Sequence, residues 1–201
     1  MAGRPRSFDR DAALAAAVEQ FWREGYEETS VATLTAAMGV SPPSLYAAFG
    51  DKHRLFEEAA ATYFRRTCEA LDRAAEMPTA RAAISRMLDE TAHAHTDAAS
   101  PPGCLMLSEP HLTAQREELH RRLQDRLDRG VRDGDLAPGT RTDHLASFLV
   151  AVMRGMSGCA RDGGTTEDLL AIAGTAMAAF PPLLGAEGEE PGRAEGVGAH
   201  F

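Results

Sequence analysis

Residues 29–52 read TSVATLTAAMGVSPPSLYAAFGDK, and this stretch decides the fold. Two short apolar segments are separated by Gly39, which allows the chain to turn tightly. Thr29 or Ser30 precedes the first segment and Ser41 precedes the second, and hydroxyl residues are favoured helix N-caps. An aspartate stands where the next helix would begin. The stretch therefore predicts two short helices joined by a tight turn, with a further helix directly after them.

Helical patterning continues on both sides of this stretch. Apolar residues recur at helical spacing from Leu14 to Trp22, and β-branched and aromatic residues are scarce along all 201 residues. That composition favours helix over sheet. The chain is therefore predicted to be all-α with about nine helices, of which the later ones are expected over residues 51–76, 80–97, 104–107 (a short apolar turn), 114–133, 142–161 and 165–180.

Charge is distributed unevenly along the chain. The net charge is −9, which is unusual for a protein that binds nucleic acid. Residues 1–56 carry six basic and seven acidic side chains, so this part is nearly neutral and the remainder carries −8. A nearly neutral N-terminal part is compatible with a binder that uses a few well-placed contacts instead of a broad basic surface. For the acidic part alone, solubility is an equally good explanation.

Several functional classes find no support in the sequence. No apolar run reaches the ~18 residues that a membrane span needs, and no signal peptide opens the chain, so no membrane partner is expected. Three widely spaced cysteines indicate a reduced, cytoplasmic protein. The histidines have no metal-ligand spacing, and neither a nucleophile elbow nor a phosphate-binding glycine loop is present. No catalytic residues, metal or cofactor are therefore predicted.

The two short helices have the layout of a helix-turn-helix motif. In such a motif the N-terminal residues of the second helix reach base edges in the major groove. Here those residues are Ser41, Pro42, Pro43 and Ser44. Hydroxyls bond to bases, and prolines offer apolar contact to thymine methyl groups. Helix N-termini and hydroxyls also bind phosphate, so Thr29 and Ser30 are further candidates for contact with DNA.

The same residues, continued to Lys52, resemble the DNA-binding region of the TetR family of bacterial transcription regulators. The resemblance is close from Phe8 to Tyr63 and departs at the two prolines, where many members carry other residues. It implies that Tyr46 and Lys52 hold the phosphate backbone. Tyr46 is alternatively a core aromatic, although Leu45 and Phe49 already occupy the side of this helix that faces the core. Lys52 is alternatively an ordinary surface charge.

Residues 1–7 form a basic arm that contains Arg4 and Arg6. Arginines of such arms enter narrow minor grooves, but an unstructured, solubilising tail explains them equally well. The expected domains are a helix-turn-helix DNA-binding domain with this arm over residues 1–54, a ligand-binding and dimerisation domain over 55–184, and a disordered tail over 185–201.

A ligand pocket is expected between the fifth and eighth helices. Flexible thioethers suit a pocket for varied ligands, although methionine also fills ordinary cores. The candidate ligand-binding residues are Met87, Thr91, His95, Met106, Ser108, His111 and Phe148.

The last two helices are predicted to form a dimer interface as a four-helix bundle with a second chain, because both are strongly apolar. The same stripe is alternatively part of the domain core. The candidate interface residues are Leu145, Leu149, Val152, Met153, Met156, Leu169, Ala173 and Met177.

Together these features predict a TetR-like, homodimeric, DNA-binding repressor that a small-molecule effector of unknown identity releases from a palindromic operator. The alternative is a helical ligand-binding or enzymatic domain whose N-terminal helices are only structural. Residues alone do not identify the effector or the operator.

Overall fold

The computed structural model describes residues 8–182, and every regular element within them is an α-helix. The predicted all-helical architecture with about nine helices is confirmed. Arg4, Arg6 and the segment 185–201 lie outside the described residues. No helix between residues 8 and 182 is both long enough and apolar enough to cross a membrane. The helices are α1 (Arg10–Glu28), α2 (Val31–Met38), α3 (Pro42–Phe49), α4 (Lys52–Ala75), α5 (Ala80–His95), α6 (Leu105–Ser108), α7 (Thr113–Asp133), α8 (Thr142–Arg161) and α9 (Thr166–Ala179).

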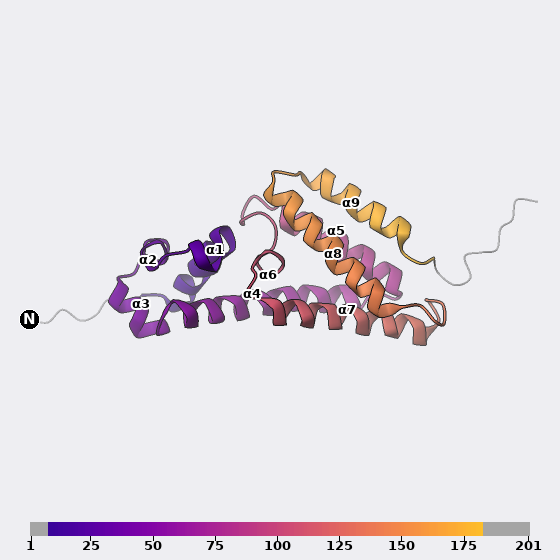
Figure 1. The fold of residues 1–201 in the computed structure, drawn as a ribbon, viewed down its shortest axis with the longest axis horizontal. Helices are drawn as coiled ribbons and strands as arrows, with labels where there is room; N and C mark the ends of the chain where they lie inside the picture. The colour runs from indigo at the N-terminus through magenta and orange to yellow at the C-terminus, as the bar shows by residue number, and fades with distance from the viewer. Residues whose placement is uncertain (1–7, 183–201) are drawn as a thin grey trace, which may run out of the picture.

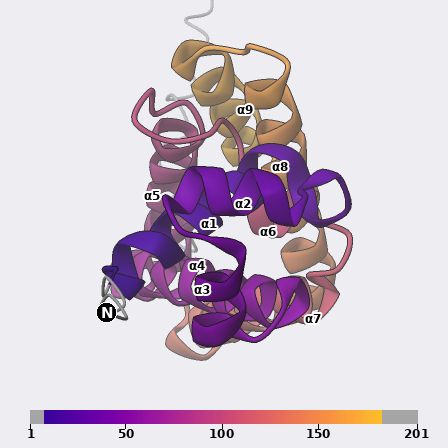
Figure 2. The same ribbon diagram turned by 90° about the vertical axis from the view of Figure 1, so that its left-hand side faces the viewer.

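The long helix α4 extends along most of the molecule (Figure 1). Helices α1, α2 and α3 gather at its N-terminal end, and α7 lies beside its C-terminal half. Helices α5, α8 and α9 pack together above α7, with α6 between them and α1. Viewed from the end of the molecule, α2 and α3 are the outermost elements (Figure 2).

Side-chain caps define where the first four helices begin. Asp9, Ser30, Ser41 and Asp51 each accept a hydrogen bond from a backbone N–H in the first turn of the following helix. Such a cap satisfies a donor that would otherwise lack a partner. Between α2 and α3, Gly39 adopts the left-handed conformation with φ of 65°. The caps and this glycine thus produce the turn that the sequence predicts.

A small apolar core holds this N-terminal unit together. Its fully buried members include Phe21 of α1, Leu34 of α2, Leu45 of α3 and Leu55 of α4. The ring of Phe21 also packs edge-on against Phe56, with 5.1 Å between ring centroids. One residue from each helix therefore meets at a single centre, which fixes α3 relative to α1 and α4.

Gly25 ends the regular part of α1. The residue has φ of 81° and kinks the helix, which then continues for one more turn to Glu28. Thr29 ends this last turn, and its hydroxyl donates to the Gly25 carbonyl over 2.6 Å. Glycine at this position allows the non-helical backbone that separates the last turn from the rest of α1.

Polar contacts join α4, α5 and α7 at their ends. The buried Arg126 of α7 donates to the carbonyls of Ala75, the last residue of α4, and of Met77, just after that helix. Asp135, just after α7, accepts from the backbone N–H of Ala80 at the start of α5. The carbonyl of Gly130 accepts the backbone N–H of Asp135. The absence of a side chain at Gly130 lets this loop lie against α7.

The close approach at Gly130 leads to a stability prediction. A Cβ atom there would lie 2.7 Å from the Cβ atom of Ala80, which cannot move without its backbone. Overpacking of this kind costs about 1–3 kcal/mol, against a gain in helix propensity of at most about 1 kcal/mol. Gly130→Ala should therefore lower the free energy of unfolding in urea by about 1 kcal/mol or more. Gln124→Ala on the same helix is the control and should change it by less than about 0.5 kcal/mol.

Candidate nucleic-acid interface and ligand cavity

The N-terminal end of α3 is an exposed surface of hydroxyls and proline rings. Ser41, Pro42 and Pro43 are exposed, and Ser44 is half-buried. The hydroxyls of Ser41 and Ser44 lie 2.9 Å apart and share a hydrogen bond. Among residues 8–182, α3 lies at the tip of the molecule (Figure 2), and its first residues are exposed there. The helix can therefore enter a groove of matching width.

Tyr46 points away from the core, as its position beside the inward stripe predicts. It is 49% exposed, whereas Leu45 and Phe49 are buried. An exposed tyrosine one turn after the start of α3 offers its hydroxyl to a partner outside the chain.

Lys52 makes contacts within the protein that the sequence did not predict. Its ammonium lies 4.3 Å from the centroid of the Tyr26 ring and donates to the Glu27 carbonyl over 3.4 Å. Both partners belong to the last turn of α1. Lys52 thereby joins the start of α4 to the end of α1, and its side chain is half-buried.

The structure changes the expected role of Thr29 but not that of Ser30. Thr29 is 0% exposed and its hydroxyl is bound to the Gly25 carbonyl, so its prediction as a DNA contact is wrong. Ser30 is exposed and accepts the N–H of Thr33 over 3.0 Å as the N-cap of α2. The sequence allowed either residue to cap α2, and the kink at Gly25 decides between them.

Sequence reasoning missed the polar junction between the N-terminal unit and the rest of the chain. The carboxylate of Glu109, just after α6, accepts the backbone N–H of Tyr26 over 2.8 Å. It also accepts from His111, whose Nδ1 is 2.6 Å away. Burial by itself raises the pKa of Glu109, but the hydrogen bonds from Tyr26 and His111 outweigh it, and the pKa lies below its usual value. The carboxylate is therefore charged at neutral pH and satisfied by hydrogen bonds.

A second contact joins α8 to the same part of α1. Arg161, the last residue of α8, donates to the Trp22 carbonyl over 2.7 Å. The same nitrogen lies 2.9 Å from the hydroxyl of Ser108 in α6. No motif in the sequence indicates these contacts, because their partners are separated by up to 139 positions.

A cavity of about 600 Å³, here termed the α1 cavity, lies between α1, α4, α5 and the segment leading to α6. Ala15, Val18, Glu19 and Trp22 form its α1 wall. The other walls are formed by Tyr63, Arg66, Thr67, Ala70, Leu71 and Arg73 of α4, by Met87, Glu90, Thr91, Ala94 and His95 of α5, and by Ala99, Ser100, Gly103 and Cys104.

The polar side chains of the inner wall are uncharged. The Tyr63 hydroxyl lies 3.2 Å from the sulfur of Cys104, and burial raises the pKa of both groups. Burial, together with the nearby charge of Arg161, lowers the pKa of His95 to about 4. At neutral pH this wall therefore presents a phenol, a thiol and a neutral imidazole.

Two residues that line the α1 cavity have buried nitrogen atoms without a partner. They are Nε1 of Trp22 and Nδ1 of His95, and His95 as a whole is only 7% exposed. A buried polar group that lacks a hydrogen bond costs roughly 1–3 kcal/mol. Two such groups on residues that line one cavity make it a candidate place for a ligand's polar atom.

The predicted ligand-binding residues do not all lie in one cavity. Met87, Thr91 and His95 line the α1 cavity. Ser108 and His111 line a separate hollow of about 240 Å³ beside the last turn of α1. Met106 is buried, and Phe148 is 38% exposed on α8. The hollow described between α4, α5 and α7 is only about 40 Å³, because large side chains fill this core. A pocket between the fifth and eighth helices stays a prediction.

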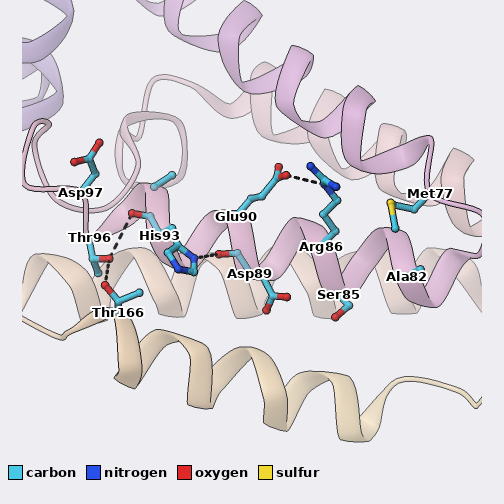
Figure 3. Close-up of a pocket in the computed structure, with 11 residues that line it drawn as sticks. Met77, Ala82, Ser85, Arg86, Asp89, Glu90, His93, Thr96, Asp97 and Thr166 are labelled. Carbon is cyan, nitrogen blue, oxygen red and sulfur yellow. Dashed lines mark hydrogen bonds and ion pairs between the residues drawn. The ribbon is translucent and has the colours of Figure 1, made fainter.

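An open groove of about 1000 Å³ runs along α5 (Figure 3). Most of its charged groups, the Asp89 carboxylate excepted, are engaged with one another or with the backbone. Arg86 pairs with Glu90 over 2.8 Å, and Nδ1 of His93 lies 2.8 Å from the carbonyl of Asp89. Thr96 and Thr166 share a hydrogen bond across the end of the groove. These interactions leave the groove less suited to a ligand than the α1 cavity.

Most of the predicted dimer-interface residues belong to the core of the protomer. Leu149, Met153, Met156, Leu169 and Ala173 are buried, so their prediction as interface residues is corrected. They are buried because α8 and α9 pack against α5 and each other. Leu145, Val152 and Met177 are half-buried and remain available in part. The outer face of the two helices carries Phe148 and mostly small residues. These small residues are Ala151, Gly155, Ala171, Gly174 and Ala178.

Comparisons with known proteins agree with this arrangement. Residues 13–59 match the family described as bacterial regulatory proteins, tetR family. The chain is 34% identical to the HTH-type transcriptional repressor ComR of Escherichia coli (strain K12), covering 90% of this chain and 93% of ComR. It is 31% identical to the repressor BdcR of the same strain, covering 90% and 94%. Among solved structures, a cysteine mutant of the TetR family transcriptional regulator CifR, complexed with 26-base-pair operator DNA, superposes with a TM-score of 0.83. Its identity is 41%, over 89% of this chain and all of that one.

The polar junction makes folding stability dependent on pH. The pKa of Glu109 is depressed in the folded protein, so its contribution is present above the unfolded pKa and is lost as pH falls through the folded pKa. The melting temperature should fall on acidification between about pH 5 and pH 3, and Glu109→Gln should flatten that part of the profile while lowering it at pH 7. Glu57→Gln, in the exposed His53–Glu57 pair, is the control and should leave the profile unchanged. An unaltered acid limb in Glu109→Gln would contradict this assignment.

Proposed function

The chain belongs to the TetR family of bacterial regulators, and we propose that it acts in the cytoplasm as a homodimeric repressor that a small-molecule effector releases from operator DNA. The family consists of regulators and not enzymes, so the enzymatic alternative is set aside. We assign DNA binding to residues 1–54, and effector binding and dimerisation to residues 55–184.

The exposed N-terminal end of α3 carries the proposal. Ser41, Pro42, Pro43 and Ser44 lie at the tip of the molecule, on a helix fixed by the apolar core beneath it. In the proposed complex these residues face base edges, with hydroxyls for hydrogen bonds and proline rings for thymine methyl groups. Tyr46 lies one turn further along α3, where its hydroxyl can reach the phosphate backbone.

A homodimer is part of the proposal because one short helix supplies little affinity. Two copies of α3 read two half-sites about one helical turn of DNA apart, and their separation decides whether both bind at once. An effector that favours another separation weakens DNA binding. By linkage, DNA then weakens effector binding by the same factor.

The charge on Lys52 is proposed to contact a phosphate and should affect binding irrespective of sequence. Lys52→Met removes the charge, and with it the contact between the ammonium and the Tyr26 ring, but keeps an unbranched aliphatic side chain. It should weaken the affinity for the duplex upstream of the gene and the affinity for a random duplex of equal length by a similar factor. The slope of log affinity against log salt should fall by about 1 per protomer.

Ser44→Ala and Arg86→Met are the matched comparisons for this experiment. Ser44→Ala should alter the preference between the two duplexes more than the salt slope, because a lost base contact is specific to sequence. Arg86→Met removes a cation that pairs with Glu90 on α5 and should change neither quantity. An unchanged salt slope in Lys52→Met would show that this lysine serves only the contact with α1.

Dimerisation is proposed through the outer face of α8 and α9. Within the described residues, the exposed large hydrophobic side chains are Phe148 on this face and Tyr46 on α3. Phe148→Ser should weaken the dimer by about 3 kcal/mol for the two copies together, or roughly 100-fold in dissociation constant. Tyr46→Ser is the matched control and should leave the dimer intact while weakening DNA binding. Analytical ultracentrifugation over a concentration series measures the self-association of both variants. A Phe148→Ser protein with unaltered self-association would place the interface elsewhere.

A further inference from the structure

We propose that the α1 cavity binds a neutral, largely apolar molecule carrying one oxygen atom that accepts a hydrogen bond from Nε1 of Trp22. This inference rests on the proposed function, since it names the chemical class of the effector. It also places the effector against α1 itself, in contact with the helix that supports α3, and not within the core of α5, α7 and α8.

The lining of the cavity favours a neutral ligand over a charged one. The inner wall consists of apolar side chains and of the uncharged Tyr63, Cys104 and His95. The nearby cation, Arg161, already binds the Trp22 carbonyl and the Ser108 hydroxyl, so it is not free to offset the burial of an anion. The charged lining residues balance, with two acids, Glu19 and Glu90, and two arginines, Arg66 and Arg73; three of them are exposed, and Glu90 is already paired with Arg86.

The unpaired groups determine which polar atom the ligand needs. The indole nitrogen of Trp22 is only a donor, so its missing partner is an acceptor such as a carbonyl, ether or hydroxyl oxygen. Nδ1 of the neutral His95 ring is also unpaired and can accept or donate, according to its tautomer. A single oxygen on an otherwise apolar molecule therefore matches the cavity better than a hydrocarbon does.

The position of Trp22 links occupancy of the cavity to the N-terminal unit. Its indole ring packs edge-on against Tyr63 of α4, with 4.9 Å between centroids. Its backbone carbonyl accepts from Arg161 of α8 over 2.7 Å. A ligand that contacts the indole therefore acts on the residue through which α8 holds α1. A change of position at Trp22 would be transmitted to α3 through their shared core.

The inference can be tested with four probes of nearly the same shape: 4-phenylbutan-2-one, isopentylbenzene, 3-phenylpropionate and the cation of 4-phenylbutan-2-amine. Trp22 is the single tryptophan of the chain, so its fluorescence reports binding at the cavity directly. The ketone should bind saturably and roughly tenfold more tightly than the hydrocarbon, the gain expected from one hydrogen bond to a buried, unpaired donor. Both ions should bind more weakly than the ketone. Absence of saturable ketone binding, equal affinity for ketone and hydrocarbon, or tighter binding of either ion would overturn the inference.

Variants assign the binding to this cavity, with calorimetry as the measurement. Trp22→Phe keeps an aromatic ring but removes the N–H, so it should weaken ketone binding roughly tenfold and hydrocarbon binding by less than about twofold. Thr91→Phe fills the cavity from α5 and should abolish binding of both probes. Ser85→Phe, on the same helix but in the open groove, is its control and should change neither. Full ketone affinity in Trp22→Phe or Thr91→Phe would overturn the inference.

Operator binding, measured separately by titration, distinguishes this inference from the proposed function. If the ketone binds with the expected dependence on Trp22 but leaves DNA affinity unchanged, the α1 cavity is a binding site. The proposal that an effector at this site releases the protein from DNA is then wrong. If the protein binds operator DNA and no probe occupies the cavity, the repressor assignment stands and the cavity assignment falls.

Discussion

The rest of the structure depends on the attachment of α1 to two bodies at once. One face of α1, with Phe21 at its centre, packs into the apolar core shared with α2, α3 and α4. The end of the same helix is held from the other side, where Glu109 accepts the Tyr26 N–H and Arg161 donates to the Trp22 carbonyl. Apolar packing fixes α3 relative to α1, and charge-assisted hydrogen bonds fix α1 relative to α6 and α8.

These two kinds of attachment respond differently to a displacement. Apolar packing tolerates small movements of a whole unit, because all the groups in the N-terminal core move together. A hydrogen bond to a buried carboxylate is directional and short, so a shift of about an ångström removes most of its benefit. A displacement of α1 relative to α6 and α8 would therefore break the contacts of Glu109 and Arg161 first, while the unit that carries α3 stays intact.

Local signals in the sequence predicted most of the fold and the outline of the DNA-binding surface. Serine and aspartate caps, proline at the start of α3 and glycine between α2 and α3 act within a few residues, so they can be read directly. Contacts between distant segments left no such signal. The burial of Thr29 follows from the kink at Gly25, and the α1 cavity depends on how α1, α4 and α5 come together. The prediction that the apolar face of α8 forms the dimer interface was wrong for a related reason. Periodicity identifies an apolar face but not whether that face meets the protomer core or a second chain.

Helix α8 contributes to the protomer core with one face and to the proposed dimer interface with the other. Its large apolar residues, such as Leu149 and Met156, pack inward, and small residues such as Gly155 face outward, where a Cβ atom would meet nothing within 4 Å. Small outward residues allow the helices of two chains to approach closely in the proposed dimer. The same helix ends at Arg161, which holds α1 through Trp22. In that dimer α8 contacts both the partner chain and α1, so the distance between the two α3 helices is determined by how firmly Arg161 holds Trp22. A ligand beside Trp22 would then change that distance without any movement of the dimer interface.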